Sequence, residues 1–157
     1  MEDGMDRIEI IEYEDKYHQR FKELSYEWLI KYDLLEPEDE IILNNPRKQV
    51  LDKGGRIFFA KCNDEIVGTS SIIKINESTF ELAKLGVTES YQRMGISKKL
   101  IEKCILASKE ESAKNLILYT NRKLHAAANL YKQLGFVEVD ITENKYIEAD
   151  VKMKLVL

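Results

Sequence analysis

Alternation of apolar and polar positions predicts most of the strands of this chain. The segment 7–13 alternates, whereas 56–60 is a continuous apolar run, typical of a central strand covered on both faces. Asn63 and Asp64 supply a tight turn, which predicts a hairpin between the strands on either side. Strands are expected at 7–13, 56–60, 66–75, 79–87, 116–120, 136–141 and 150–157.

Between these strands the apolar period changes to 3.6, which predicts helices packed on one face. Tyr17, Phe21, Leu24 and Trp28 share such a face, and Pro37 suits the first turn of a second helix. Gly135 is placed to end the last helix in the left-handed conformation. Helices are expected at 17–31, 37–43, 97–110 and 124–134.

The order of these elements predicts a mixed α/β (α+β) sheet. Because a helix separates strands 79–87 and 116–120, that pair should be parallel, whereas the strands before it form an antiparallel meander. With 157 residues and 44% apolar content, the chain can bury one substantial core. We expect a single domain, 1–157, with six to seven mostly antiparallel strands and about four flanking helices.

Charge and cysteine content narrow the functional classes. The net charge is only −4 and both signs are interspersed, which disfavours nucleic acid and anionic membranes as partners. Cys62 and Cys104 lack the spacing of metal ligands, so we expect buried thiols in a reducing compartment and no metal. The short acidic segment 1–7 does not resemble a signal peptide or a membrane span. A cytoplasmic location is the simplest expectation.

The segment 85–97 runs from a strand through a polar loop into a helix N-terminus. Unpaired amide groups and the positive end of the helix dipole make such a terminus an anion site. Gly95 allows close approach to phosphate, Gln92 and Arg93 add donors, and the Ser97 hydroxyl can cap the helix or contact an oxygen. A glycine before a helix is by itself equally well explained as a structural turn.

As a whole, this string resembles the coenzyme A motif of the GNAT acetyltransferase superfamily, Gln/Arg-x-x-Gly-x-Gly/Ala after a strand. Gln92, Gly95 and Ser97 fall on its fixed positions, although Gly or Ala is usual at the last. The order of elements also matches over nearly the whole chain. The resemblance implies a splayed parallel strand pair that admits acetyl-CoA. It implies coenzyme contacts, mainly through main chain, at Leu85, Val87, Gln92, Arg93, Met94, Gly95, Ile96 and Ser97.

A second segment, 127–136, resembles the Ala-x-x-x-Leu-Tyr-x-x-x-Gly-Phe junction of the same superfamily. The resemblance implies that Tyr131 is the general acid for the departing thiolate, whereas periodicity alone favours a core aromatic. Many relatives carry Asn seven residues earlier to contact pantetheine, but this chain has Leu124. Asn121 is a candidate substitute, with helix capping as an equal alternative.

Two further sets of residues are candidates for the base and the acceptor pocket. Glu81 interrupts a mostly apolar strand and could accept a proton; the alternatives are a solvated carboxylate or an ion-pair partner of Lys84. His18 and His125 lie on charged faces and are expected to be solvated. The resemblance implies an acceptor pocket lined by the first two helices and the loop before the last strand, where relatives vary most. The candidates there are Trp28, Tyr32, Glu36 and Tyr146, with helix initiation as the alternative for Glu36.

With these residues, the resemblance implies an N-acetyltransferase. The acetyl group of acetyl-CoA would pass to a primary amine of a small molecule or peptide by direct attack, through a tetrahedral intermediate. The alternative is a non-catalytic acyl-CoA-binding module. A nucleotide-dependent enzyme is disfavoured because the Walker Lys-Ser/Thr ending and the Rossmann three-glycine spacing are missing. No motif selects the acceptor, and a homodimer is left open.

Overall fold

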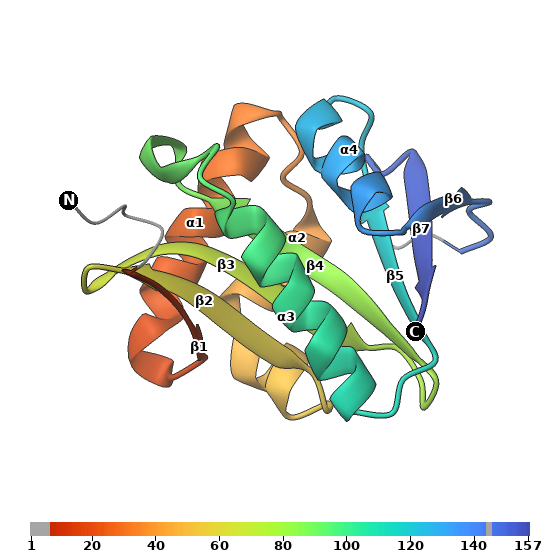
Figure 1. Ribbon diagram of the computed structural model, residues 1–157, viewed down its shortest axis with the longest axis horizontal. Helices are drawn as coiled ribbons and strands as arrows, with labels where there is room; N and C mark the ends of the chain where they lie inside the picture. The colour runs from red at the N-terminus through yellow and green to blue at the C-terminus, as the bar shows by residue number, and fades with distance from the viewer. Residues whose placement is uncertain (1–6, 144–145) are drawn as a thin grey trace.

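A seven-stranded sheet forms the centre of the computed structural model, which describes residues 7–143 and 146–157 (Figure 1). Within these residues the strand order is β1-β2-β3-β4-β5-β7-β6. All neighbouring strands are antiparallel except β4 and β5, which confirms the expected mixed sheet. The strands are β1 (Ile8–Glu12), β2 (Arg56–Cys62), β3 (Glu65–Lys74), β4 (Thr79–Val87), β5 (Asn115–Thr120), β6 (Val137–Val139) and β7 (Val151–Val156).

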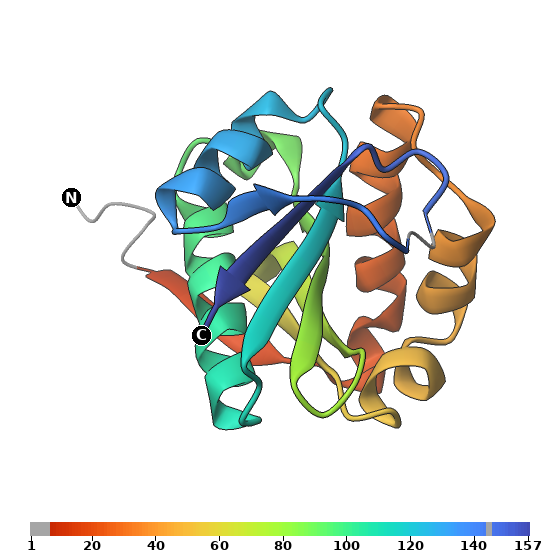
Figure 2. The ribbon, with the colours of Figure 1, turned by 90° about the vertical axis from the view of Figure 1, so that its right-hand side faces the viewer.

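Helices cover both faces of this sheet (Figures 1 and 2). Helices α1 and α2 lie on one face, and α3 and α4 on the other. They are α1 (His18–Lys31), α2 (Pro37–Asn44), α3 (Ile96–Glu110) and α4 (His125–Gln133). A 3-10 turn, Asp15–Tyr17, precedes α1, and a π-helical turn that the sequence did not predict spans Arg47–Leu51.

Each face of the sheet carries its own apolar core. The core beneath α3 is built around Phe58, Leu100 and Leu116, and the core beneath α1 and α2 around Phe21 and Phe59. Cys62 and Cys104 are thiols buried in the first core and not joined by a disulfide, as predicted. Burial raises the pKa of Cys104 to about 12, so its side chain is a neutral filler of the core.

Local turn chemistry also matches the sequence. Asn63 and Asp64 both have positive φ, 50° and 68°, and connect β2 to β3 as a tight hairpin. Gly135, at φ 100°, follows the end of α4. Because a left-handed residue there turns the chain back over the sheet, it directs the next residues into β6.

Strands β4 and β5 pair over a short stretch only. Their parallel register joins Thr79–Glu81 to residues 115–117, although β4 continues to Val87 and β5 to Thr120. A bulge in β4 lies beyond the last pair, where Lys84 adopts φ 56° and the register against β3 shifts. The two strands therefore diverge beyond Glu81, as Figure 2 shows, and the expected splayed pair is confirmed.

A buried ion pair ties α2 to this bulge. The Lys84 ammonium donates to the Asp39 carboxylate, and only 3% and 4% of the two side chains are exposed. Asp39 also accepts a hydrogen bond from the Glu36 main-chain N–H at 2.9 Å. We expected Lys84 as an alternative partner of Glu81; the lysine instead pairs with α2, because the bulge directs it to that side of the sheet.

We predict that Asp39→Asn lowers the free energy of unfolding by about 3–5 kcal/mol, because it leaves the Lys84 ammonium buried without its countercharge. Asparagine retains an oxygen for the Glu36 N–H, so the helix start is preserved. Urea unfolding monitored by circular dichroism measures the change. Asp15→Asn, which removes an exposed ion pair with Arg47, is the control and should cost much less. Equal losses in the two variants would contradict the prediction.

Candidate active site

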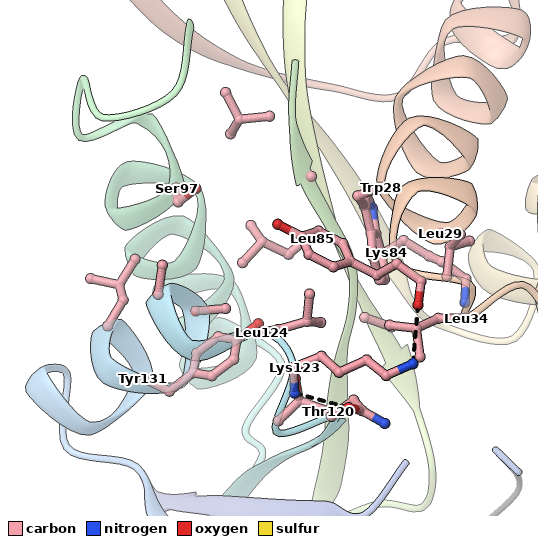
Figure 3. Close-up of a pocket in the computed structure, with 18 of the residues that line it drawn as sticks. Trp28, Leu29, Leu34, Lys84, Leu85, Ser97, Thr120, Lys123, Leu124 and Tyr131 are labelled. Carbon is pink, nitrogen blue, oxygen red and sulfur yellow. Dashed lines mark hydrogen bonds between the residues drawn. The ribbon is translucent and has the colours of Figure 1, made fainter. Parts of the chain in front are cut away.

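A cleft of about 1010 Å³ opens where β4 and β5 diverge. Figure 3 shows Ser97 and Tyr131 on one side of it, Trp28 and Lys84 on the other, and Leu85 between them. We call the part bounded by the β4–α3 loop and α4 the α3 arm. We call the part bounded by the end of α1, the start of α2 and Tyr146 the α1 arm. Both arms belong to one continuous cleft.

The α3 arm ends at an uncapped helix terminus. Gly95 precedes α3 with φ 79° and ψ 9°, and no side chain caps the helix. The first-turn amide groups, which include those of Ser97 and Lys98, therefore face the cleft without an intrahelical acceptor. Together with the positive end of the helix dipole, these amides form a site suited to a phosphate or pyrophosphate group.

The side chains of the β4–α3 loop have different roles from their main chain. Gln92 donates from Nε2 to the Val87 carbonyl at 2.9 Å, so its amide closes the loop onto the end of β4. Arg93 has φ 65° and is exposed at the rim. Ile96 is buried but lines the cleft, which leaves its main chain for a ligand. Met94 packs against the core and is not among the described residues that line the cleft, so the structure gives no support to the contact predicted for it.

Tyr131 reaches the α3 arm from α4. Its ring packs against Phe136 with centroids 5.8 Å apart, and Figure 3 shows its hydroxyl directed into the cleft. Burial, with a smaller contribution from Cys104, raises the pKa of the Tyr131 phenol above its ordinary value of about 10. The ring therefore fills the core, as periodicity alone favours, and the hydroxyl lies at the cleft; its role as general acid stays a prediction.

The β5–α4 connection carries the position that differs from the family motif. Leu124 lines the cleft directly before α4. The Asn121 side chain accepts from the Lys123 N–H at 2.9 Å and donates to the Glu148 carbonyl. Asn121 therefore lines the cleft but has both ends of its amide engaged in holding two loops together.

Glu81 lies in the α1 arm at the last β4–β5 pair. Only 1% of it is exposed, so the alternative of a solvated strand carboxylate is wrong. It accepts a hydrogen bond from the Tyr146 hydroxyl at 2.9 Å. Burial and the Glu81 charge raise the pKa of Tyr146, whose ring lies 5.8 Å from Tyr119 and 5.2 Å from the Lys84 ammonium. This arm holds a buried carboxylate beside aromatic rings.

Three other side chains predicted for the acceptor pocket also line the α1 arm. Trp28 packs directly over Gly86, where an added Cβ would lie only 2.6 Å from the indole. Tyr32 ends α1, and its carbonyl accepts from the Lys123 ammonium at 3.5 Å across the cleft (Figure 3). Glu36 is buried and accepts from the main-chain N–H groups of residues 147 and 148, both at 2.6 Å.

Sequence reasoning missed Lys123 and the partners of Glu36, because contacts over such separations leave no local pattern. It was also wrong about His18. The His18 ring donates from Nε2 to the Leu43 carbonyl at 2.8 Å and is half-buried, because the carbonyl near the end of α2 needs a donor. His125 is exposed at the rim of the cleft, as expected.

Within residues 7–143 and 146–157, no group of three or more His, Cys, Asp or Glu side chains is arranged to hold a metal ion. No helix in these ranges is both long and apolar enough to cross a membrane.

Comparison with known proteins identifies the family to which this fold and cleft belong. The chain belongs to the Acetyltransferase (GNAT) family, which it matches over residues 8–136. It is 28% identical over 101 residues to an uncharacterized N-acetyltransferase of Bacillus subtilis, covering 62% of this chain and 65% of that protein. The chain therefore spans slightly less than two thirds of that relative.

Solved structures agree with this assignment. A GNAT-family acetyltransferase of Staphylococcus aureus superposes with a TM-score of 0.86 at 26% identity, covering 95% of this chain and 98% of that one. A GNAT-family acetyltransferase of Elizabethkingia anophelis, solved with acetyl-CoA bound, superposes with a TM-score of 0.69 at 25% identity. Coverage is 97% of this chain and 99% of that structure.

We predict that acetyl-CoA raises the melting temperature of the protein and that Gly95→Val abolishes this shift. A β-branched residue is strongly disfavoured at φ 79°, and the loop must move away from the phosphate-binding position. Differential scanning fluorimetry with and without saturating acetyl-CoA measures the effect. Gly54→Val is the matched control, since Gly54 is also left-handed, at φ 96°, but does not line the cleft. It should destabilise the free protein yet retain the shift; loss of the shift in both variants would contradict the assignment.

Proposed function

We propose that this protein is an N-acetyltransferase that transfers the acetyl group of acetyl-CoA directly to a primary amine. The observation that carries the proposal is the continuity of the cleft. It joins the uncapped terminus of α3 to the buried carboxylate of Glu81 through the opening between β4 and β5, with the Tyr131 hydroxyl directed into it. Family membership and the relative with bound acetyl-CoA support the choice of cosubstrate.

The α3 arm fits the coenzyme. The first-turn amides of α3 would hold the pyrophosphate, and the left-handed Gly95 keeps the approach clear. Beyond Glu81, the edge of β4 that faces β5 has no strand partner among the described residues. The main chain at Leu85 and Val87 can therefore pair with the pantetheine arm as an added strand would. When bound, acetyl-CoA supplies the activated acetyl group.

Two proton transfers remain for side chains of this chain. Tyr131 stays protonated because burial raises its pKa, so it can protonate the sulfur that leaves the acetyl group. Glu81, at the other end of the opening, would receive the proton that the amine loses on attack. An amide of the free β4 edge would stabilise the negative oxygen that forms meanwhile. The attacking amine must be neutral, so a cationic acceptor first loses one proton to solvent; on attack the nitrogen then loses one proton to Glu81, and Tyr131 supplies one to the departing sulfur.

We predict that Tyr131→Phe lowers kcat by about 100-fold or more, with little change in the KM for acetyl-CoA, because it removes a proton donor and keeps the ring that packs on Phe136. Release of free coenzyme thiol in the presence of a responsive amine measures turnover. Tyr13→Phe, on a ring that stacks with Phe59 outside the cleft, is the control. An unchanged kcat in the Tyr131 variant would remove its role as acid.

We also predict that ionisation of Tyr131 does not limit kcat below about pH 10. A raised pKa keeps the acid form populated as pH increases, so the alkaline decline expected for a tyrosine acid moves upward from about 10. The kcat profile between neutral pH and pH 10 tests this, with circular dichroism at each pH to exclude unfolding. A decline with an apparent pKa near 8 that disappears in Tyr131→Phe would contradict it.

Measuring thiol release with a broad range of primary amines distinguishes the proposed enzyme from the non-catalytic alternative. If acetyl-CoA protects the protein from unfolding but none of a broad range of primary amines releases free thiol, the chain is an acyl-CoA-binding module. If no protection occurs either, the coenzyme assignment itself fails.

A further inference from the structure

The segment 146–148 crosses the α1 arm and is held from three separate elements. The Tyr146 hydroxyl donates to Glu81 on β4. The main chain of residues 147 and 148 donates to Glu36, which directly precedes α2. The Glu148 carbonyl accepts from Asn121 after β5. These contacts fix the segment over the arm in which the acceptor amine would lie.

The Glu36 contacts are the firmest of these. Its carboxylate is 7% exposed and accepts two main-chain N–H groups, both at 2.6 Å. Hydrogen bonds to an ionised acceptor contribute about 1.5–3 kcal/mol each, roughly twice as much as those between neutral groups. The buried charge is therefore stabilised by amide dipoles, and separating the segment from Glu36 would leave a carboxylate and two amides without partners.

A second bridge crosses the cleft between the same arm and α4. The side chain of Lys123 extends from the β5–α4 connection to the carbonyl of Tyr32 at the end of α1 (Figure 3). At 3.5 Å and exposed, this contact is weaker than those of Glu36. The α1 arm is thus crossed at two places, once firmly and once loosely.

Resting on the proposed function, we infer that Glu36 is a specificity-determining positioning residue that restricts the acceptor to small primary amines. A polypeptide acceptor must continue outward from its reacting amine, past the rim of the α1 arm. Between Glu36 and the segment 146–148, that rim is bridged by two hydrogen bonds at 2.6 Å, so a main chain cannot leave the arm at this place without breaking them. A compact amine needs no such passage.

The interior of the arm favours an organic cation. The Glu81 carboxylate attracts a protonated amine, and the rings of Trp28, Tyr32, Tyr119 and Tyr146 line the same space. Lysine ammonium groups already lie 5.2–5.7 Å from three of these rings, those of Tyr32, Tyr119 and Tyr146, so the rings mainly bury the apolar carbon of an acceptor. Small alkyl and arylalkyl amines combine both properties, so this class of acceptor fits the arm.

The test compares wild type, Glu36→Ala and Glu36→Gln with phenethylamine and spermidine, an unstructured peptide with a free N-terminus, and an N-blocked peptide with one lysine. We expect wild type to acetylate at least one small amine and neither peptide. Glu36→Ala should raise the KM for that amine about tenfold, the equivalent of one lost charged hydrogen bond, and should gain measurable peptide turnover. The KM for acetyl-CoA should stay within about twofold, and Glu36→Gln should be intermediate, because an amide offers one acceptor oxygen.

Glu40→Ala is the matched control, because it removes an exposed acidic residue from the first turn of α2 and does not touch the segment 146–148. It should behave as wild type. Amide hydrogen exchange gives a readout independent of turnover: the amides of residues 147 and 148 should be protected in wild type and exchange faster in Glu36→Ala only. Unchanged exchange in that variant would overturn the positioning role.

Kinetic measurements distinguish failure of the size restriction from failure of the proposed acetyltransferase function. Comparable kcat/KM for a peptide and the best small amine in wild type would overturn the size restriction and leave the acetyltransferase function intact. If Glu36→Ala raised the KM for the small amine and the KM for acetyl-CoA equally, Glu36 would have a general structural role and the inference would also be overturned. Absence of thiol release with every amine, despite thermal protection by acetyl-CoA, would overturn the proposed function and the inference that rests on it.

Discussion

Strands β4 and β5 share main-chain hydrogen bonds only as far as Glu81 and its partner Ile117, and the cleft depends on their divergence beyond that pair. A parallel sheet edge left open in this way has unpaired main-chain groups, which need an acceptor or donor from elsewhere. The left-handed Lys84 contributes to the divergence by introducing a bulge into β4 against β3. Main-chain geometry therefore creates the site before any side chain contributes chemistry.

The two arms of the cleft use electrostatics in opposite ways. In the α3 arm, the positive end of a helix and its unpaired amides attract anions, with no buried cation required. In the α1 arm, three acidic residues are buried; Asp39 pairs with Lys84, and Glu36 accepts from two main-chain amides. Glu81, held by Tyr146, lies where the arms meet. An anionic cosubstrate and a cationic acceptor would thus approach from opposite directions.

Buried polar contacts also connect the first third of the chain to its middle and to its end. Glu36 contacts two residues that follow it by 111 and 112 positions in the sequence, and Lys84 follows its partner Asp39 by 45 positions. These links close the α1 arm after the sheet and helices have brought the segments together. Since a buried charge without a partner is costly, each contact also favours one arrangement of the loops around the cleft.

The sequence by itself determined the elements, their order, the parallel crossover, the loop from Gln92 to Ser97 and the position of Tyr131. Apolar periodicity, turn residues and motif spacing are local properties, which a single chain displays directly. The predictions that failed also rested on local patterns. His18 was judged from its helix face alone, and the π-helical turn Arg47–Leu51 was missed because it has no simple apolar period.

The tertiary structure alone decided which partner each buried charge has. Lys84 pairs with Asp39 and not with Glu81, Gln92 closes its own loop, and Glu36 holds a segment from the far end of the chain. Such choices depend on which side of a bulged strand a side chain faces and on which loops meet above it. These distances exist only after folding, so no pattern along the sequence encodes them.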